Sequence, residues 1–349
     1  MDTPGQKSGS GRATIEDVAR MAGVSIKSVS RVVNGEPHVS QKLRDKVSAA
    51  IAALHYVPDM AARSLAGARA FIIGLLIDNP SPNYTIKVQR GVYRACVEQS
   101  YHMRLDHIDS TGTGDELERS LAAMLRNSRC DGFILTPPLA DDTRVLESFE
   151  RAKVRYVRIG PNIMLDRAQS VRMDDAGAAA LVAQHLWDLG HRRFGLVTGP
   201  ESLSAALMRR QGFLDKLAEL GFEGQVPQAE GGFTVHGGVK AGERLLAGSA
   251  RPSAIFATND DSAVGTMVAA LGAGLTVPRD LSVCGFDDSW MAQSAWPNLT
   301  TIYQPIEEMG YAAAQMLLDR SGNGPQVLTL PYRLIERDSA APPAAHPTP

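Results

Sequence analysis

Lys27 and Arg31 are four residues apart in the segment 14–34, TIEDVARMAGVSIKSVSRVVN. In a helix, this spacing puts both side chains on one face. Arginine can donate two parallel hydrogen bonds to O6 and N7 of guanine, lysine can reach the same acceptors, and an apolar side chain such as Ile26 can contact the methyl group of thymine. The chemistry that these residues could perform is therefore base recognition in the major groove of DNA.

Two short helices joined by a glycine turn are expected to position these side chains. Thr14 and Asp17 have the spacing of a capping box that starts the first helix, Gly23 supplies the turn, and Ser25 caps the second helix. A third helix is expected from about Ser40 to His55. The inward-facing residues of these three helices are Ile15, Val18, Ala19, Ala22, Val29, Val32, Val33, Leu43, Val47, Ile51 and Leu54.

The sequence offers little that could carry catalysis or hold a metal. It has no G-x-S-x-G, no G-x-x-x-x-G-K and no G-x-G-x-x-G after an expected strand. Cys96, Cys130 and Cys284 are widely separated and odd in number, and no pair forms a C-x-x-C motif, so neither a disulfide framework nor a zinc site is indicated. His102 and His107 are five residues apart around an expected strand, which suits surface histidines better than metal ligands. We expect no metal and no cofactor.

Charge is unevenly divided along the chain. The whole sequence of 349 residues has a formal net charge of -2, yet residues 12–69 contain nine Lys and Arg against five Asp and Glu. This stretch is therefore +4 and the remainder is -6, so the basic part is the one suited to meet phosphate. An acidic remainder limits non-specific binding to nucleic acid.

The remainder of the chain alternates strand-like apolar runs with helical patterns. FIIGLLID (71–78), GFILTPP (132–138), FGLVTG (194–199) and LSVCGFDD (281–288) are examples of the strands. This alternation predicts an α/β fold with parallel sheets, and the number of units suggests two lobes. The N-terminus lacks an apolar signal segment and no run of about 18 apolar residues occurs, so we expect a soluble, cytoplasmic protein that does not contact a membrane.

At this point the chain resembles the LacI/GalR family of bacterial transcriptional repressors, from Thr14 to about Asp338. The resemblance is carried by TIEDVARMAGVS, SVSRVVN, HYVPDMAARSLAG (55–67), HLWDLGHRR (185–193), GFDDS (285–289) and NLTTIYQP (298–305). It implies a two-lobed body with the fold of periplasmic sugar-binding proteins. The ligand would lie between the lobes, and the chain would cross between them near Val171, Leu299 and Leu330.

The resemblance also implies which residues meet DNA. It places base contacts on Ile26, Lys27 and Arg31. The alternatives are that Ile26 packs in the core of the head and that Lys27 is simply exposed to solvent. Further DNA contacts fall on Thr14, Ser25, Ser28, Ser30 and Asn34.

A hinge helix in residues 58–69 is a second implied DNA contact. In the family, two such helices pair in the minor groove, and the leucine matching Leu65 wedges between the central base pairs; Ala62 and Arg63 match its other contacts. About eight residues cannot hold a helix alone, so a plain linker is the alternative reading. Asp59 departs from the asparagine usual in the family, which puts its role in doubt.

Six body residues match the effector-binding positions of the family. Asp174, Arg209, Asn259 and Asp287 are the polar candidates, Phe233 is a stacking wall, and Tyr84 is a candidate from the other lobe. The alternatives are an interlobe ion pair between Arg209 and Asp287, a helix cap at Asn259 and a surface aromatic at Tyr84. Asp174 and Asp287 could also form a glycosidase pair, although the resemblance makes them ligand acceptors.

The resulting prediction is a regulator with no enzymatic activity, acting as a homodimer on a palindromic double-stranded DNA operator and released by a small neutral sugar or glycoside. Corepression by a purine-like effector, and a ligand-free dimeric regulator, are the alternatives. A dimer is favoured over a tetramer because the tail AAPPAAHPTP has no heptads. The expected organisation is a disordered 1–12, a helix-turn-helix domain at 13–57, a hinge at 58–69, the two-lobed body at 70–338 and a disordered tail at 339–349.

Overall fold

The computed structural model describes residues 13–33, 38–56, 69–248, 251–319, 321 and 326–344. The chain divides into two compact units, Met1–Phe71 and Ile72–Pro349. We call them the head and the body. The expected hinge residues Ala62, Arg63 and Leu65, together with Asn34 and Asp59, lie outside the described residues.

In the described residues of the head, three helices surround one small core. They are α1 (Ile15–Ala22), α2 (Ile26–Val33) and α3 (Gln41–Ala53). Val18, Val29 and Val47 are completely buried where the three helices meet. The capping box between Thr14 and Asp17 is formed, and Gly23 takes the left-handed conformation (φ 57°) that lets the chain turn toward α2. The sequence prediction of three helices with these inward-facing residues is confirmed.

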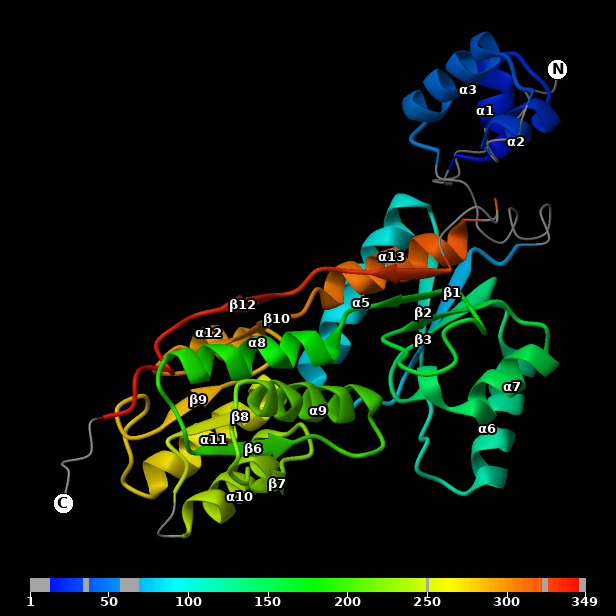
Figure 1. Cartoon of the computed structure of the whole chain (residues 1–349). Helices are drawn as coiled ribbons and strands as arrows, with labels where there is room; N and C mark the ends of the chain where they lie inside the picture. The colour runs from blue at the N-terminus through cyan, green and yellow to red at the C-terminus, as the bar shows by residue number, and fades with distance from the viewer. Residues whose placement is uncertain are drawn as a thin grey trace, which may run out of the picture. The chain divides into compact units, whose positions relative to one another are not determined.

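The first lobe of the body is a six-stranded parallel sheet with helices on both faces (Figure 1). Its strand order is β11-β5-β4-β3-β1-β2. The strands are β1 (Ile72–Ile77), β2 (His102–His107), β3 (Gly132–Leu135), β4 (Tyr156–Ile159), β5 (Ser170–Arg172) and β11 (Val327–Thr329). The helical elements are α5 (Pro82–Glu98), α6 (Gly114–Asn127), η1 (Leu139–Asp141), α7 (Thr143–Arg151) and α13 (Ile306–Leu318).

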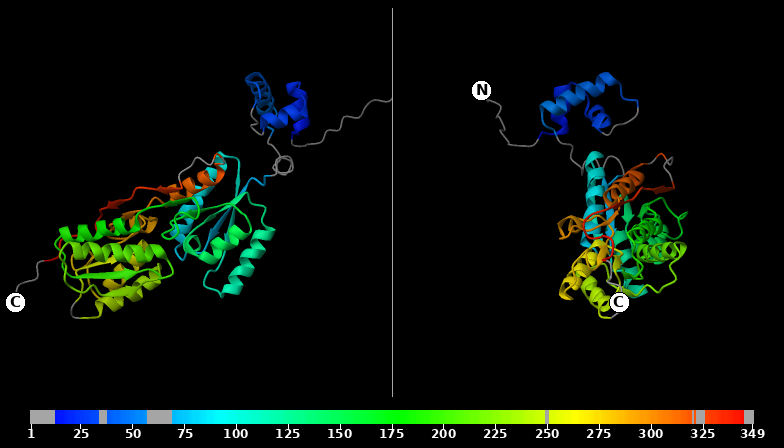
Figure 2. Two further views of the ribbon diagram at one scale, coloured as in Figure 1. Left: turned by 45° about the vertical axis from the view of Figure 1, so that its right-hand side comes forward. Right: turned by 60° about the vertical axis from the view of Figure 1, so that its left-hand side comes forward.

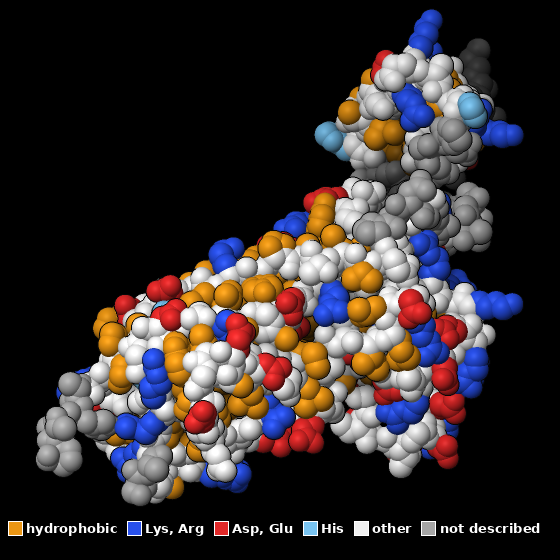
Figure 3. Space-filling view, in the orientation of Figure 1, with side chains coloured by type: hydrophobic (Ala, Val, Ile, Leu, Met, Phe, Trp, Pro, Cys, Tyr) orange, Lys and Arg blue, Asp and Glu red, His pale blue; other side chains and the backbone are white. Residues whose placement is uncertain are grey.

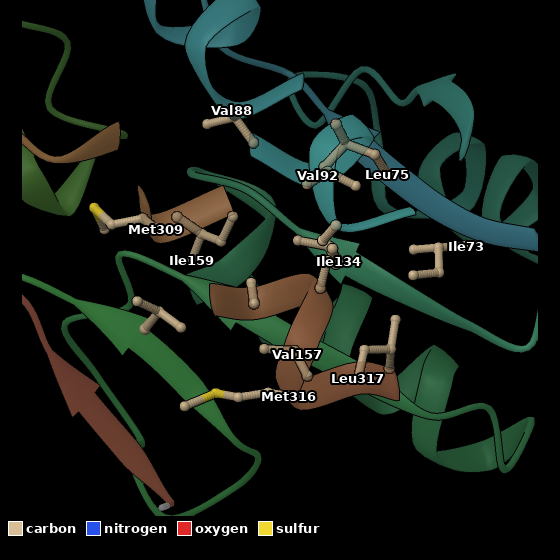
Figure 4. Close-up of a cluster of buried hydrophobic side chains, with 14 of the residues drawn as sticks. Ile73, Leu75, Val88, Val92, Ile134, Val157, Ile159, Met309, Met316 and Leu317 are labelled. Atoms are coloured by element: carbon tan, nitrogen blue, oxygen red, sulfur yellow. The ribbon is translucent and has the colours of Figure 1, made fainter. Parts of the chain in front are cut away.

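Side-chain alternation along β1 divides the core of this lobe in two. Ile73 and Leu75 pack with α5 and α13 in one cluster (Figure 4), whereas Leu76 packs with α6 and α7 in another. Successive residues of a strand point to opposite faces, which explains why the run IIGLLI is apolar throughout.

The second lobe is a four-stranded parallel sheet of order β7-β6-β8-β9, also covered on both faces (Figure 2). Its strands are β6 (Phe194–Thr198), β7 (Gln228–Glu230), β8 (Ala254–Ala257) and β9 (Ser282–Cys284). Its helices are α8 (Asp175–Asp188), α9 (Ser204–Glu219), α10 (Val235–Leu246), α11 (Asp260–Gly272) and α12 (Trp290–Ser294). A two-stranded antiparallel ribbon of β10 (Thr301–Tyr303) and β12 (Arg333–Ile335) completes the lobe.

The chain passes between the lobes three times. It leaves the first lobe after β5, returns between β10 and α13 at Gln304, and crosses again between β11 and β12 after Leu330. The first and third crossings are close to the expected positions, and the second falls a few residues after Leu299. The predicted α/β fold of two lobes with parallel sheets is confirmed, and no helix in the described part of the chain has the length and apolar character needed to cross a bilayer.

The prediction of a disordered tail from residue 339 is wrong for its first residues. Ser339 is completely buried, donates through Oγ to the carbonyl oxygen of Val283 and accepts from the backbone N–H of Thr300. The carbonyl oxygen of Ala341 lies 2.9 Å from Nε2 of His191, and burial holds the pKa of His191 below its ordinary value. The Ala/Pro-rich composition suggested disorder, but specific hydrogen bonds fix these residues on the second lobe.

Helices α5 and α13 pack so closely that a glycine is required between them. A Cβ added at Gly91 would overlap the carbonyl oxygen of Glu307 and crowd the backbone nitrogen of Tyr311. We expect Gly91→Ala to lower the free energy of unfolding of the body by about 1–3 kcal/mol, the range for overpacked sites. Urea unfolding measures this. Gly114→Ala on α6 is the control, since a Cβ there meets nothing within 4 Å, and an equal effect of both changes would contradict the close packing.

Candidate functional site

Helix α2 of the head exposes Ile26 and Lys27, two of the side chains that the sequence assigned to DNA, while Arg31 is half-buried. Ile26 is 48% exposed and does not belong to the core cluster of the head, so its alternative reading as a core residue is wrong. Lys27 is exposed as well, while Val29 on the opposite side is buried. Ile26 and Lys27 therefore lie outside the core of the head and are available for contacts with another molecule.

Serines shape the start of α2. The Oγ of Ser25 accepts a hydrogen bond from the backbone N–H of Ser28 at 3.1 Å, which confirms Ser25 as the cap of this helix. A helix N-terminus with exposed serine hydroxyls is suited to phosphate. Thr14 occupies the corresponding place at α1, where its Oγ1 donates to Asp17 at 2.7 Å. Contacts of Thr14, Ser25, Ser28 and Ser30 with phosphates stay a prediction.

The body contains a cavity between its two lobes, at the carboxyl ends of the strands. The first lobe contributes Tyr84, and the second contributes Arg209, Phe233 and Asp287. This is where parallel sheets commonly bind ligands. The full lining is Asn79, Ser81, Tyr84, Pro137, Gly160, Asp175, Leu203, Ala205, Arg209, Phe233, Asn259, Asp287 and Gln304.

Arg209 bonds to several of the residues around this cavity. It is 4% exposed, and its guanidinium group donates to Asp175 Oδ1 at 2.8 Å, to the carbonyl oxygen of Thr258 at 2.8 Å and to Gln304 Oε1 at 3.1 Å. Its Nη1 lies 3.6 Å from Asp287 Oδ1. The alternative of an interlobe ion pair between Arg209 and Asp287 is wrong, because both residues belong to the second lobe.

The two carboxyl groups beside Arg209 are buried. Burial raises the pKa of Asp175 and of Asp287 above the ordinary range, and the positive charge of Arg209 opposes this rise. Asp287 also has a positive φ of 117°, a backbone conformation that non-glycine residues rarely adopt and that recurs at functional sites.

The prediction for Asp174 is corrected by one residue. Asp174 is exposed and forms the N-cap of α8, with its Oδ1 accepting from the backbone N–H of Gly177 at 2.9 Å. Asp175, at the first helical position, turns into the cavity instead and binds Arg209. Of the two carboxyl groups that could have formed a glycosidase pair, Asp287 lines the cavity, whereas Asp174 is exposed and is not part of the lining.

Asn259 lies at the cavity and also caps α11. Its Oδ1 accepts from the N–H of Ser262 at 2.9 Å, and its Nδ2 donates to the carbonyl oxygen of Phe233 at 3.3 Å. The amide thereby connects the helix to the turn that carries Phe233. The helix-cap reading of Asn259 is confirmed, and its contact with an effector stays a prediction.

Two aromatic side chains form the apolar walls. Phe233 is 5% exposed, and its ring touches the backbone of Gly199, where an added Cβ would overlap it. Tyr84 is 8% exposed at the start of α5, so its alternative reading as a surface aromatic is wrong, and burial raises the pKa of its hydroxyl. Small-molecule sites usually combine apolar or aromatic walls with a few polar groups that orient the ligand.

Comparison with known proteins agrees with both parts. The family described as "Bacterial regulatory proteins, lacI family" matches residues 14–59, and the "Periplasmic binding protein-like domain" matches residues 183–340. The ribose operon repressor of Escherichia coli (strain K12) is 34% identical over 340 residues, covering 94% of this chain and 100% of the repressor. The chain belongs to the LacI family of bacterial regulatory proteins. It is a DNA-binding transcriptional regulator, as the sequence predicted.

Other members of the LacI family are similar over comparable lengths. The transcriptional repressor PurR of Klebsiella pneumoniae (strain 342) is 32% identical, with 94% of this chain and 97% of PurR covered. The lac repressor dimer bound to its operator and an anti-inducer has a TM-score of 0.76 at 28% identity, with 95% and 100% covered. A LacI family regulator from Enterococcus faecium with bound ribose has a TM-score of 0.69 at 28% identity, with 78% and 99% covered.

The cavity contains residues that the sequence analysis missed. Asp175, Gln304, Asn79 and Ser81 were not assigned, although all four are polar and line the site. Gln304 lies within the motif NLTTIYQP, and Asn79 follows the first strand, so position at the end of a strand is the signal that could have found them.

Proposed function

We propose that this LacI-family regulator is a repressor without enzymatic activity, which binds a near-palindromic operator as a dimer and is released by a small neutral sugar. The observation that carries the effector proposal is Arg209, fixed between the carboxyl groups of Asp175 and Asp287 and facing the ring of Phe233. Both carboxyl groups pair with the same guanidinium group. Carboxyl groups held in this way are better suited to binding a ligand through fixed hydrogen bonds than to transferring a proton in catalysis.

The charge of the cavity favours a neutral effector. Two aspartates and one arginine are the charged residues of its lining. The guanidinium group of Arg209 is already shared by Asp175 and Asp287, so it offers little attraction to an anionic ligand, and an ionised carboxyl group beside it would repel one. Hydroxyl groups of a sugar can instead both donate to the carboxylates and accept from the guanidinium group and from amides.

The two lobes leave little open space between them in this conformation, about 30 Å³ for the centres of water-sized molecules. A sugar of any length can therefore enter only when the lobes move apart, and the choice among sugars rests on the relatives. Two relatives support a pentose: one is named for the ribose operon, and another was solved with bound ribose.

Exposed apolar side chains support the proposed homodimer. Ile86, Tyr93 and Val97 are exposed on α5, and Val268 and Leu271 on α11. Large exposed apolar side chains that gather on helices are typical of protein interfaces. In Figure 3 the face shown has charged side chains crowded over α6 and α7, which favours other surfaces for the dimer contact.

The proposal is tested by fluorescence anisotropy of the full chain on its own upstream DNA at fixed salt. We expect tight binding that D-ribose or another neutral monosaccharide releases. The two aromatic walls, Tyr84 and Phe233, could also hold a flat purine base, and PurR is among the relatives. Binding that hypoxanthine strengthens and that no sugar affects would contradict the sugar effector and indicate a corepressor.

A further inference from the structure

Asp261 connects the two lobes at the edge of the cavity. It lies in the first turn of α11 in the second lobe and is 5% exposed. Its Oδ2 accepts from Ser81 Oγ at 3.0 Å, and its Oδ1 accepts from Asn83 Nδ2 at 2.8 Å. Ser81 and Asn83 both belong to the start of α5 in the first lobe, so one carboxyl group is bound by two donors from the opposite lobe.

The hydrogen bonds across the lobes are what make burial of this carboxylate tolerable. Burial raises the pKa of Asp261, and the groups that oppose the rise are the donors Asn83 and Ser81 themselves. If the lobes separate, water replaces these donors. The carboxylate therefore keeps these two donors only when the lobes are closed, and its further contact with Asn259 Nδ2 at 3.4 Å lies within its own lobe.

Lys87 forms a second connection from the same helix. Its Nζ donates to the backbone carbonyl oxygens of Asp287 and Asp288, both at 2.8 Å. Both aspartates have positive φ angles, so a lysine from the first lobe binds the strained turn that presents Asp287 to the cavity. The closed arrangement of the lobes thereby also fixes an effector-site residue.

The opposite flank of the cavity is closed in a similar way. Ser204 at the start of α9 in the second lobe donates to Asp141 Oδ2 at 2.6 Å and accepts from Asn162 Nδ2 at 3.0 Å. Asp141 and Asn162 belong to the first lobe. Hydrogen bonds between protein groups thus join the lobes on both sides of the cavity without the participation of a ligand.

We propose that Ser81, Asn83 and Asp261 form a clasp whose formation closes the lobes around the effector, and that Asp261 is a positioning residue for effector binding. The inference rests on the proposed effector cavity. Since a compact ligand must be touched from both lobes, its apparent affinity depends on how much of the protein is closed. Breaking the clasp is expected to lower that fraction.

The test reverses the polarity of one hydrogen bond. Asn83→Asp places two carboxylates opposite each other and should part the lobes. Adding Asp261→Asn to Asn83→Asp restores a hydrogen bond between an amide donor and a carboxylate acceptor. The amide is then on the second lobe and the carboxylate on the first. Nitroxide labels at exposed Glu118 of α6 and Lys240 of α10, in a Cys130→Ser background, report the distance between the lobes without any ligand. We expect longer distances in Asn83→Asp and a return to the original distribution in the double variant.

Calorimetry with D-ribose gives the second readout. Asn83→Asp should raise the dissociation constant at least about tenfold, and the double variant should regain most of the affinity. Asn127→Asp, at an exposed position on α6, introduces the same charge away from the clasp and should change neither result. An unaltered distance in Asn83→Asp, or one that the second substitution does not reverse, would overturn the clasp. Reversible distance changes with no D-ribose binding by any chain would keep the clasp and contradict the proposed sugar.

Discussion

Arg209→Met is expected to abolish the response to effector and to lower the free energy of unfolding of the body by about 3–5 kcal/mol, the cost of breaking a buried ion pair from one side. The change removes the donors to Asp175, Thr258 and Gln304. Methionine keeps much of the apolar length over the ring of Phe286, where the guanidinium carbon lies 3.7 Å from the ring centroid. The loss therefore reports mainly on charge and hydrogen bonds.

The loss of stability should depend on pH in a defined direction. The pKa of Asp287 is already raised by burial, and Arg209 is the first group that opposes the rise. Without Arg209 the pKa rises further, so the folded state binds a proton that the unfolded state releases. Because burial raises the pKa of Asp287 to about 8 in the unchanged chain, the two chains differ in bound protons only above that pH. The loss of stability in the variant should therefore be larger at pH 9 than at pH 6.

Urea unfolding at the two pH values and operator titrations with and without the effector measure these effects. Arg210→Met is the matched control, because Arg210 is the next residue of α9 and bonds to Gln228 at the surface rather than to the cavity. A chain with Arg209→Met that still responds to effector would show that this cavity is not the effector site. Equal stability losses at both pH values would contradict the raised pKa of Asp287.

The sequence was sufficient to predict most of the architecture, because the relevant signals are local. The capping box of Thr14, the turn at Gly23 and the apolar strands of the body each depend on neighbouring residues. The same holds for the order of strands and helices that indicated two lobes. Such features change little with tertiary context.

The site was predicted less completely. Its geometry depends on the directions in which adjacent side chains point and on contacts between residues that are far apart in the sequence. Asp174 and Asp175 are adjacent, and only the choice of which one caps α8 decides which one meets Arg209. Asp261 bonds to Ser81 across 180 residues of sequence. Neither a hydrophobic period nor a motif encodes such a contact. The buried tail at Ser339 was missed for the same reason, since its partners lie on β9 and near β10.

The second prediction with a large expected effect tests whether Arg31 contacts a base, as the resemblance to the family implies. Arg31→Ala is expected to weaken operator binding by about 1–3 kcal/mol per half-site, the value of a bidentate contact to guanine, and to relax specificity at one base pair of each half-site. Because a dimer would use two heads, the cost on a full operator should be close to twice that on a half-site. Helix α2 supports the assignment, since Ile26 and Lys27 beside Arg31 are exposed.

Fluorescence anisotropy at fixed salt, on the operator and on versions with symmetric single base-pair changes, measures this specificity. Arg20→Ala is the control: Arg20 lies on α1, exposed and paired with Asp17 at 3.0 Å. It should weaken binding little and equally for every sequence. If Arg31→Ala also weakens all operators equally and reduces the salt dependence, Arg31 contacts a phosphate and not a base. Base recognition would then be carried by Lys27 and Ile26, and substitution of those residues should produce the relaxed specificity instead.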